Sequence, residues 1–443
     1  MITKTTGYVS AHLQIQPLIR FRHKRFMASY EAAPPIKTST LQAKIFKKAW
    51  NTSEEFKRST LKMWSTHLRG VEFTKAQLEL YQKKLMSNIE IGGSMDNIIT
   101  AHGINQWHFH NDNVLKIDIK TPVLLIHGYA SSSMSFFRNV SHLSQHCKDL
   151  FAIDLPSNGL SERSSLKVTP FDVSIFGQSE DINNCTQLKI TRLPDDEKVQ
   201  RCIEEHEDYY LEAIEQWRLD NAIDKFHLVG HSFGGYLSYK YALKYPHAVN
   251  KLCLISPLGM ERNLLSMSSN HWKLGEIIDK DFHDPMSDRY CRKLNIPKYV
   301  FENQLKILRW GGPMGARLCW NYITSAYSRV PSLDFKEYMF ELFYGKGGIS
   351  PIARTIFVNL FTRNLLARAP IMDTLDQLKV EDMLLCYGQH DWMNRRAGQL
   401  AVQTLNKGNY TPARYLQIPQ AGHNLFLDNP DCFNVALTSF LKD

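Results

Sequence analysis

The fold is decided by Gly230-His231-Ser232-Phe233-Gly234, which has the pattern G-x-S-x-G. The apolar run Phe226–Val229 precedes it, and the helix-forming stretch Gly235–Leu243 follows it. Strand, sharp turn and helix form the context in which this pattern holds a nucleophilic serine. The glycines leave room for a strained serine backbone, which presents the hydroxyl at a helix N-terminus where developing negative charge is stabilised. We therefore predict that Ser232 is a nucleophile.

A serine hydroxyl is a weak nucleophile until a base takes its proton, and that base needs an orienting acid. Asp391 follows the apolar strand Met383–Tyr387, and His423 comes just after the strand Arg414–Pro419. Both residues therefore fall on loops at one edge of a parallel sheet. We predict Asp391 as the orienting acid and His423 as the general base and acid.

A rival for the acid stands five residues after His423, at Asp428. The stretch Asp428-Asn429-Pro430 precedes the helix-like Phe433–Leu437, so the position of Asp428 favours a helix N-cap. Asp391 remains the preferred acid.

An oxyanion hole needs backbone N–H groups directed at the tetrahedral oxygen. One is expected from Phe233, the residue after the nucleophile. The other is expected from the loop His127-Gly128-Tyr129-Ala130, which follows the strand Pro122–Ile126. Tyr129 is the first choice for this second donor, and Ala130 is the alternative.

These segments, in this order, resemble the α/β-hydrolase superfamily over about residues 105 to 440. A narrower resemblance is to the lipid-acting branch that contains the mammalian lipid-droplet lipase co-activator, and within it to a fungal group with a mitochondrial cardiolipin-specific deacylase and a lysophosphatidate acyltransferase. The segments that carry it are Gln106–His110, His127–Ser132, Ile214–Arg218, Asp391–Met393 and Gly422–Pro430. The co-activator lacks the nucleophilic serine, whereas this chain keeps Ser232, so the resemblance implies a working enzyme.

The resemblance implies a phospholipid acyl hydrolase that converts cardiolipin to monolysocardiolipin, without cofactor or metal. Two alternatives stay open: an acyl-CoA-dependent lysophosphatidate acyltransferase, to which the spacing His423-x4-Asp428 has been linked in this branch, and a non-catalytic lipid-binding scaffold. Because water or an acceptor hydroxyl can resolve the same acyl-enzyme, these residues do not separate hydrolysis from transfer.

The net charge of +9 is concentrated at the N-terminus. Residues 1–53 hold nine Lys and Arg against the single acid Glu31, which gives +8 and leaves +1 for the remainder. The first thirty residues contain Arg, Ser and Thr but no acid, a composition that is typical of mitochondrial targeting segments. We therefore expect a leader over residues 1–35. Together with the family resemblance, this leader implies a place on the matrix face of the inner mitochondrial membrane. No nucleic-acid partner is expected. No apolar run reaches 18 residues, and the eight cysteines include no C-x-x-C pair, so neither a membrane span nor a zinc or disulfide framework is expected.

The expected architecture is an α/β-hydrolase fold with a mainly parallel central sheet and an inserted, mostly helical cap. After the leader, a helical extension is expected over 36–104, the first part of the core over 105–257, the cap over 258–378 and the second part of the core over 379–443. Residues 161–200 are expected to be irregular. Trp107 and Phe109 alternate with His108 and His110, which predicts a hairpin with residues 114–119 and a solvent-facing role for the histidines.

The expected cap is basic and aromatic from Arg289 to Arg329, with eight Lys and Arg against one acid, Glu302. Cationic side chains beside aromatics suit contact with an anionic membrane. An ordinary cap with a packed aromatic core and a solvated basic rim explains the same composition. The interleaved aromatics are Tyr290, Tyr299, Phe301, Trp310, Trp320, Tyr322 and Tyr327.

Overall fold

The computed structural model describes residues 59–113, 117–170, 172–269 and 271–442, all within one compact unit that spans Phe46–Asp443. The expected leader over residues 1–35 and the start of the expected helical extension lie outside the described residues.

A central eight-stranded sheet has the strand order β1-β2-β4-β3-β7-β8-β10-β11. The strands β3, β4, β7, β8, β10 and β11 pair in parallel, while β2 is antiparallel to both β1 and β4. The predicted mainly parallel α/β sheet is therefore confirmed. The strands are β1 (Ser94–Ile99), β2 (Asn105–His110), β3 (Val123–Ile126), β4 (Asp149–Ile153), β7 (Phe226–His231), β8 (Val249–Ile255), β10 (Asp382–Gly388) and β11 (Ala413–Ile418).

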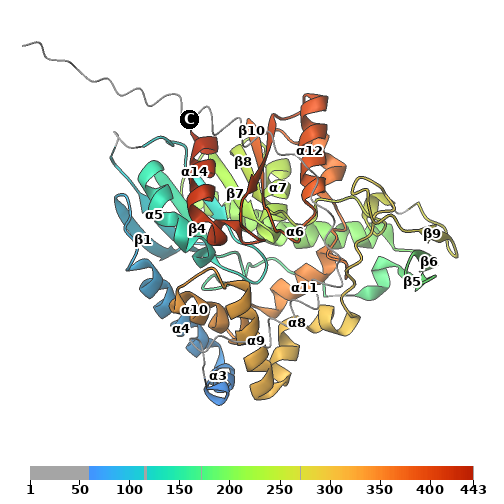
Figure 1. Cartoon of the computed structure of the whole chain (residues 1–443), viewed down its shortest axis with the longest axis horizontal. Coiled ribbons are helices and arrows are strands. Elements are labelled where there is room, and N and C mark those ends of the chain that lie inside the picture. Colours follow the sequence, from blue (N-terminus) through green and yellow to red (C-terminus); the bar gives the residue numbers. More distant parts are fainter. Residues whose placement is uncertain (1–58, 114–116, 171, 270, 443) are drawn as a thin grey trace, which may run out of the picture. The chain divides into compact units, whose positions relative to one another are not determined.

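Helices cover both faces of this sheet (Figure 1). The helices α5 (Phe137–His146) and α14 (Pro430–Leu441) lie on one face, and α6 (Asp196–Asp220), α7 (Phe233–Lys244) and α12 (Arg395–Gly408) lie on the other. Along β3, Leu124 and Ile126 point into one hydrophobic core, whereas Val123 and Leu125 point into the core on the opposite face. Burial on both faces explains the continuous apolar runs of the parallel strands.

The cap is inserted between β8 and β10 and consists mainly of α8 (Lys298–Trp310), α9 (Gly312–Ala326), α10 (Leu333–Tyr344) and α11 (Pro351–Leu360). The preceding helices α3 (Thr60–Thr66) and α4 (Gly70–Met86) pack against it: Lys84 on α4 pairs with Asp334 on α10 at 2.7 Å. The described part of the expected helical extension is thus helical as far as Met86.

Short elements complete the described chain. They are η2 (His67–Arg69), η3 (Ser133–Phe136), η4 (Val173–Phe176), β5 (Gln178–Ile182), β6 (Gln187–Arg192), η5 (Met267–Ser269), β9 (Ile277–Asp279), η6 (Ile371–Gln377) and α13 (Leu425–Asp428).

Three predictions of local structure were wrong. The strand that holds Trp107, β2, pairs with β1 on one side and β4 on the other, so the predicted hairpin partner was wrong. The helical extension predicted to reach residue 104 ends at Met86, because β1 follows it and belongs to the central sheet. Residues 161–200 are not irregular throughout, because β5 and β6 form a second, three-stranded sheet with β9. Since β9 comes from the cap insertion, this pairing joins segments about ninety residues apart, which local sequence patterns do not reveal.

Candidate active site

Ser232 lies at the sharp turn between β7 and α7, as the sequence pattern predicts. Its backbone is strained, with φ 55° and ψ −114°. A Cβ atom at Gly230 would lie 2.5 Å from the carbonyl oxygen of Gly234, and one at Gly234 would lie 2.3 Å from that of His127. A side chain at either glycine would therefore clash with backbone atoms. The strand and the helix on either side keep the Ser232 backbone in its strained conformation.

The three predicted residues Ser232, His423 and Asp391 meet in one hydrogen-bonded chain. Ser232 Oγ lies 3.0 Å from His423 Nε2, and His423 Nδ1 lies 3.2 Å from Asp391 Oδ1. With its proton on Nδ1, His423 donates to Asp391 and leaves Nε2 to accept the Ser232 hydroxyl proton. The loops after β7, β10 and β11 supply the three groups, and these strands are parallel, so all three loops meet at the carboxyl edge of the sheet.

Asp391 is buried and held by more than His423. It accepts hydrogen bonds from the Met393 N–H at 3.0 Å and from the Ser256 hydroxyl. Burial acts to raise the pKa of Asp391, but the charge and hydrogen bond of His423, with these two donors, bring that pKa below its ordinary value. The carboxylate is therefore charged at neutral pH and able to stabilise an imidazolium at His423.

The sequence did not predict two residues that support the hydrogen-bonded row of Ser232, His423 and Asp391. Ser256 follows β8 with φ 45°, and its hydroxyl reaches Asp391 from the neighbouring strand end. His231 lies under His423, where its Nε2 is 3.1 Å from the His423 carbonyl oxygen. Burial and the charge of His423 keep the pKa of His231 well below its usual range, so His231 is neutral. The position of His231 inside G-x-S-x-G is the only sequence signal for it.

Asp428, the rival acid, does not reach the imidazole. Its carboxylate accepts the Gly422 N–H at 2.7 Å and lies 3.8 Å from Arg329. The predicted helix N-cap at Asp428 was wrong by one residue, because the Asn429 side chain accepts the Cys432 N–H and caps α14. Asp428 instead fixes the loop that carries His423.

The loop after β3 lies against the nucleophile, where an oxyanion donor is required. A Cβ atom at Gly128 would lie 3.1 Å from Ser232 Cβ, and Ala130 has φ 54°, so the backbone turns tightly beside the serine. Phe233 is the first residue of α7, where backbone N–H groups have no partner within the helix. The oxyanion roles of Phe233 and Tyr129, with Ala130 as alternative, stay predictions.

Aromatic side chains from the cap and the core pack against one another next to the nucleophile turn. The Tyr129 ring stacks on Phe357 of α11 at 4.0 Å, and Phe233 makes edge contacts with Phe357 and Phe361. The Tyr129 hydroxyl donates a hydrogen bond to Gln304 in α8, where the helix is broken at φ 29° and ψ −112°. Aromatic side chains of the cap therefore pack directly against the loop that follows β3 and against the residue that follows Ser232.

This arrangement falls within a known family. Residues 121–430 match the family described as alpha/beta hydrolase fold, a segment that includes Ser232, Asp391 and His423. The chain belongs to the α/β-hydrolase fold family. A hydrolase or acyltransferase activity fits this family.

Similar proteins span nearly the whole of this α/β-hydrolase. Protein ECM18 of Saccharomyces cerevisiae is 48% identical over 413 residues, covering 91% of this chain and 89% of its own. The 1-acylglycerol-3-phosphate O-acyltransferase ICT1 of the same organism is 44% identical, over 82% of this chain and 92% of its own. The Homo sapiens 1-acylglycerol-3-phosphate O-acyltransferase ABHD5 is 25% identical, over 81% of this chain and 88% of its own.

A solved structure from Bacillus subtilis aligns with a TM-score of 0.50 and 15% identity, covering 83% of this chain and 98% of the other. This likeness supports the fold alone.

Proposed function

We propose that this α/β-hydrolase is a serine-dependent phospholipid acyl hydrolase. The observation that carries the proposal is the hydrogen-bonded chain from Ser232 through His423 to the charged Asp391. The aromatic side chains of Tyr129, Phe233 and Phe357 next to the nucleophile turn support a fatty acyl group as the part of the substrate that is bound.

The chemistry follows from the geometry. Ser232 Oγ attacks the ester carbonyl carbon while its proton moves to His423 Nε2, and Asp391 stabilises the resulting imidazolium. The N–H groups proposed at Phe233 and Tyr129 stabilise the tetrahedral oxyanion. The carbon–oxygen bond of the ester then breaks, and His423 returns the proton to the leaving lysolipid oxygen. Water, deprotonated by His423, then attacks the acyl-enzyme carbonyl carbon. The bond from that carbon to Ser232 Oγ breaks, and His423 returns the proton to Ser232 as the fatty acid leaves.

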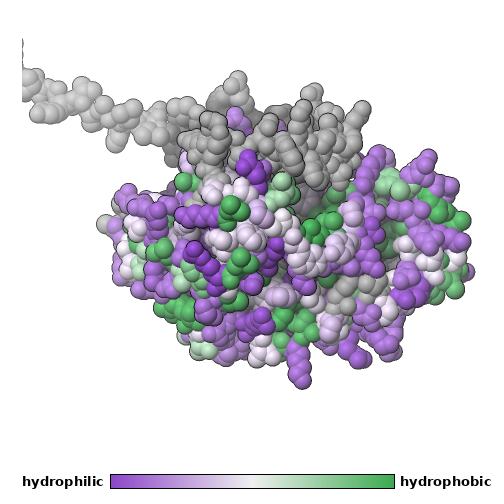
Figure 2. Space-filling model, turned by 90° about the horizontal axis from the view of Figure 1, so that it is seen from below, coloured by the Kyte–Doolittle hydropathy of each residue, from purple (hydrophilic) through white to green (hydrophobic). Residues whose placement is uncertain are grey.

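Contact with an anionic membrane is part of the proposal and is supported by one surface of the cap. The basic aromatic stretch divides into two groups: Phe301, Trp320 and Tyr327 are buried, whereas Tyr299 and Trp310 are 59% and 63% exposed. We call the exposed residues of this stretch the cap surface. Figure 2 views the molecule from the end where α3, α8 and α9 lie in Figure 1, and hydrophobic and hydrophilic residues are interspersed there. The cap surface consists of Lys298, Tyr299, Val300, Lys306, Trp310, Met314, Arg317 and Tyr322. Within the described residues, no helix combines the length and apolar character needed to cross a bilayer.

The preferred substrate is cardiolipin and the proposed site is the matrix face of the inner mitochondrial membrane. The family resemblance and the basic leader, with no acid in its first thirty residues, support both. Purified protein with cardiolipin vesicles should release fatty acid and monolysocardiolipin, and Ser232→Ala should release none. Release from neutral phosphatidylcholine but not cardiolipin contradicts the head-group assignment, and a fluorescent fusion of residues 1–35 that stays out of mitochondria contradicts the location.

A second candidate is acyl-CoA-dependent acylation of lysophosphatidate, favoured by the printed activity of the relative that is 44% identical. The same acyl-enzyme on Ser232 would form from the thioester, and the lysolipid hydroxyl would replace water. Labelled acyl-CoA with lysophosphatidate, run beside the cardiolipin assay, separates the two. If phosphatidate forms and cardiolipin is not hydrolysed, the acyltransferase replaces the acyl hydrolase as the proposed function. Absence of both products, with no labelling of Ser232 by a fluorophosphonate, supports the lipid-binding scaffold.

A further inference from the structure

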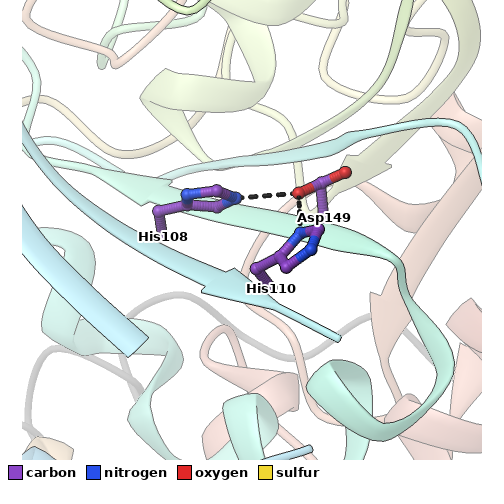
Figure 3. Close-up of side chains that lie close together, drawn as sticks. All are labelled: His108, His110 and Asp149. Atoms are coloured by element: carbon purple, nitrogen blue, oxygen red, sulfur yellow. Dashed lines mark hydrogen bonds and ion pairs between the residues drawn. The ribbon is translucent and has the colours of Figure 1, made fainter. Parts of the chain in front are cut away.

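A group of three side chains converges on one point away from Ser232: His108, His110 and Asp149 (Figure 3). One nitrogen of each imidazole and one carboxylate oxygen all lie within 4.8 Å of one another. His108 Nε2 is 2.9 Å and His110 Nδ1 is 2.7 Å from the same oxygen, Asp149 Oδ1. Among the described residues, this is the one group of three His, Cys, Asp or Glu side chains that has such convergence.

The sheet fixes this convergence. His108 and His110 are two residues apart on β2 and so point to the same face, and His110 is the register partner of Asp149 on the antiparallel strand β4. The His108 ring stacks on Phe151 at 4.2 Å with an interplanar angle of 5°, which restricts its orientation. The paired strands thus set the directions of His110 and Asp149, and ring stacking on Phe151 sets the orientation of His108.

We propose that His108 Nε2, His110 Nδ1 and the Asp149 carboxylate bind a divalent first-row transition metal ion, with Zn²⁺ as the ion that the donor set suits best. Two imidazoles and one carboxylate are preferred ligands of Zn²⁺. Tetrahedral Zn²⁺ with bonds of about 2.0–2.1 Å holds its ligand atoms about 3.3 Å apart, so opening the present 2.7 and 2.9 Å contacts by about half an ångström makes room for the ion.

Asp112 supplies a second observation that points to a ligand. Its Oδ1 lies 2.8 Å from His110 Nε2, the nitrogen that does not face Asp149. A carboxylate at this place holds the proton on Nε2 and leaves the Nδ1 lone pair for a metal, which is the usual outer arrangement of metal-bound histidines. His110, Asp112 and Gly92 also border a cleft of about 510 Å³, which gives an ion a path from solvent.

The position of the group indicates a structural role. Asp149 is the first residue of β4, at the edge of the sheet opposite the carboxyl ends that carry Ser232, Asp391 and His423. A metal ion there fastens β2 to β4. Without the ion, the two histidines share one carboxylate by hydrogen bonds, and protons compete with the metal for the same nitrogen atoms.

The test is Zn²⁺ binding to the purified full-length chain, free of any histidine tag, by calorimetric titration and by the shift in thermal midpoint. We expect one tight site, a rise in midpoint with Zn²⁺ and its reversal by a chelator. Asp112→Asn should weaken binding about 10- to 100-fold, and His110→Ala should weaken it more. His102→Ala is the matched control, because His102 pairs with Asp220 at 2.8 Å outside this group, and it should bind as the parent does.

A second measurement does not depend on the folding of any variant. X-ray absorption at the zinc edge of the parent protein should show two imidazole ligands, oxygen and no sulfur. Tight binding lost in His110→Ala but kept in His102→Ala, with this spectrum, supports the site. Absence of saturable binding, equal binding by His110→Ala, or sulfur ligands overturns it.

Discussion

Asp428 accepts a hydrogen bond from the Gly422 N–H at 2.7 Å, one residue before His423. The acid of the His423-x4-Asp428 spacing therefore acts on the backbone of the loop that holds the imidazole, and not on the imidazole itself. Arg329 of the cap completes the contact at 3.8 Å, so cap and histidine loop are joined at this carboxylate. This contact gives Asp428 a positioning role for the loop that holds His423.

Removing this support should slow the chemical step without abolishing it. A hydrogen bond to a charged group contributes about 1.5–3 kcal/mol, so we expect Asp428→Ala to lower kcat by about 10- to 100-fold. Asp428→Asn keeps an acceptor for the Gly422 N–H and should stay within a few-fold of the parent. Steady-state hydrolysis of a soluble ester measures both. An Asp428→Ala loss as complete as that of Ser232→Ala would place Asp428 in the chemistry.

Substitutions of Asp391 and Ser256 should lower kcat by very different amounts. Asp391→Asn leaves the shape of the site but removes the charge that stabilises the His423 imidazolium, and we expect kcat to fall about 10⁴-fold. Ser256→Ala removes one of several donors to Asp391 and should cost about 10-fold. The same kinetic assay decides. Equal losses in the two variants contradict the separate roles, and circular dichroism of each variant controls for folding.

The hydrogen bond between Tyr129 and Gln304 should couple cap to core. We expect Tyr129→Phe, which keeps the ring stacked on Phe357, to lower the free energy of unfolding by about 1 kcal/mol. Gln304→Ala should cost a similar amount, and the double variant should cost less than the sum because both changes remove one interaction. Denaturant unfolding of the four proteins measures this cycle. Additive costs would show that the contact does not stabilise the fold.

Buried neutral histidines should make the protein less stable in acid. Burial lowers the folded-state pKa of His127, His206 and His231, so below about pH 6.5 the unfolded chain binds protons that the folded chain does not. The free energy of unfolding should therefore be highest above that pH. It should fall as the pH decreases towards the folded-state pKa values, by up to about 1.4 kcal/mol per pH unit for each histidine. Denaturant unfolding across this range measures the slope. His231→Gln should reduce it, and an unchanged slope contradicts the assignment.

Membrane contact should depend on the cap surface and on charge. The parent protein should sediment with vesicles of anionic lipid. A double variant with Trp310→Ser and Lys306→Glu should have a severalfold smaller bound fraction. Val435→Ser is the matched control, because Val435 is as exposed as Trp310, at 63%, but lies on α14. Equal binding by all three proteins, or binding that does not fall with salt, excludes the cap surface as the contact.

The sequence predicted the parts of the site that are set by local patterns. Ser232, Asp391 and His423 each follow a strand, and parallel strands bring their carboxyl ends to one edge, so three separate local signals sufficed. Ser256 and His231 were not predicted because their roles depend on contacts between loops that are distant in sequence. The pairing of β6 with β9 was missed for the same reason.

The convergence of His108 and His110 on Asp149 also lay beyond the local pattern. The alternation along β2 places both histidines on one face, which the sequence does show, but Asp149 joins them only through the antiparallel register with β4. A solvent-facing role was the natural interpretation of the alternation alone, and the side chains are in fact 27% and 33% exposed.

The central claim is that Ser232 carries the acyl group. The most direct measurement is mass spectrometry of the protein quenched during turnover of a phospholipid with an isotope-labelled acyl chain. We expect the label on the peptide that contains Ser232, at higher occupancy when hydrolysis of the acyl-enzyme is slowed, and no label in Ser232→Ala. Label on another residue, or full activity in Ser232→Ala, would contradict the account.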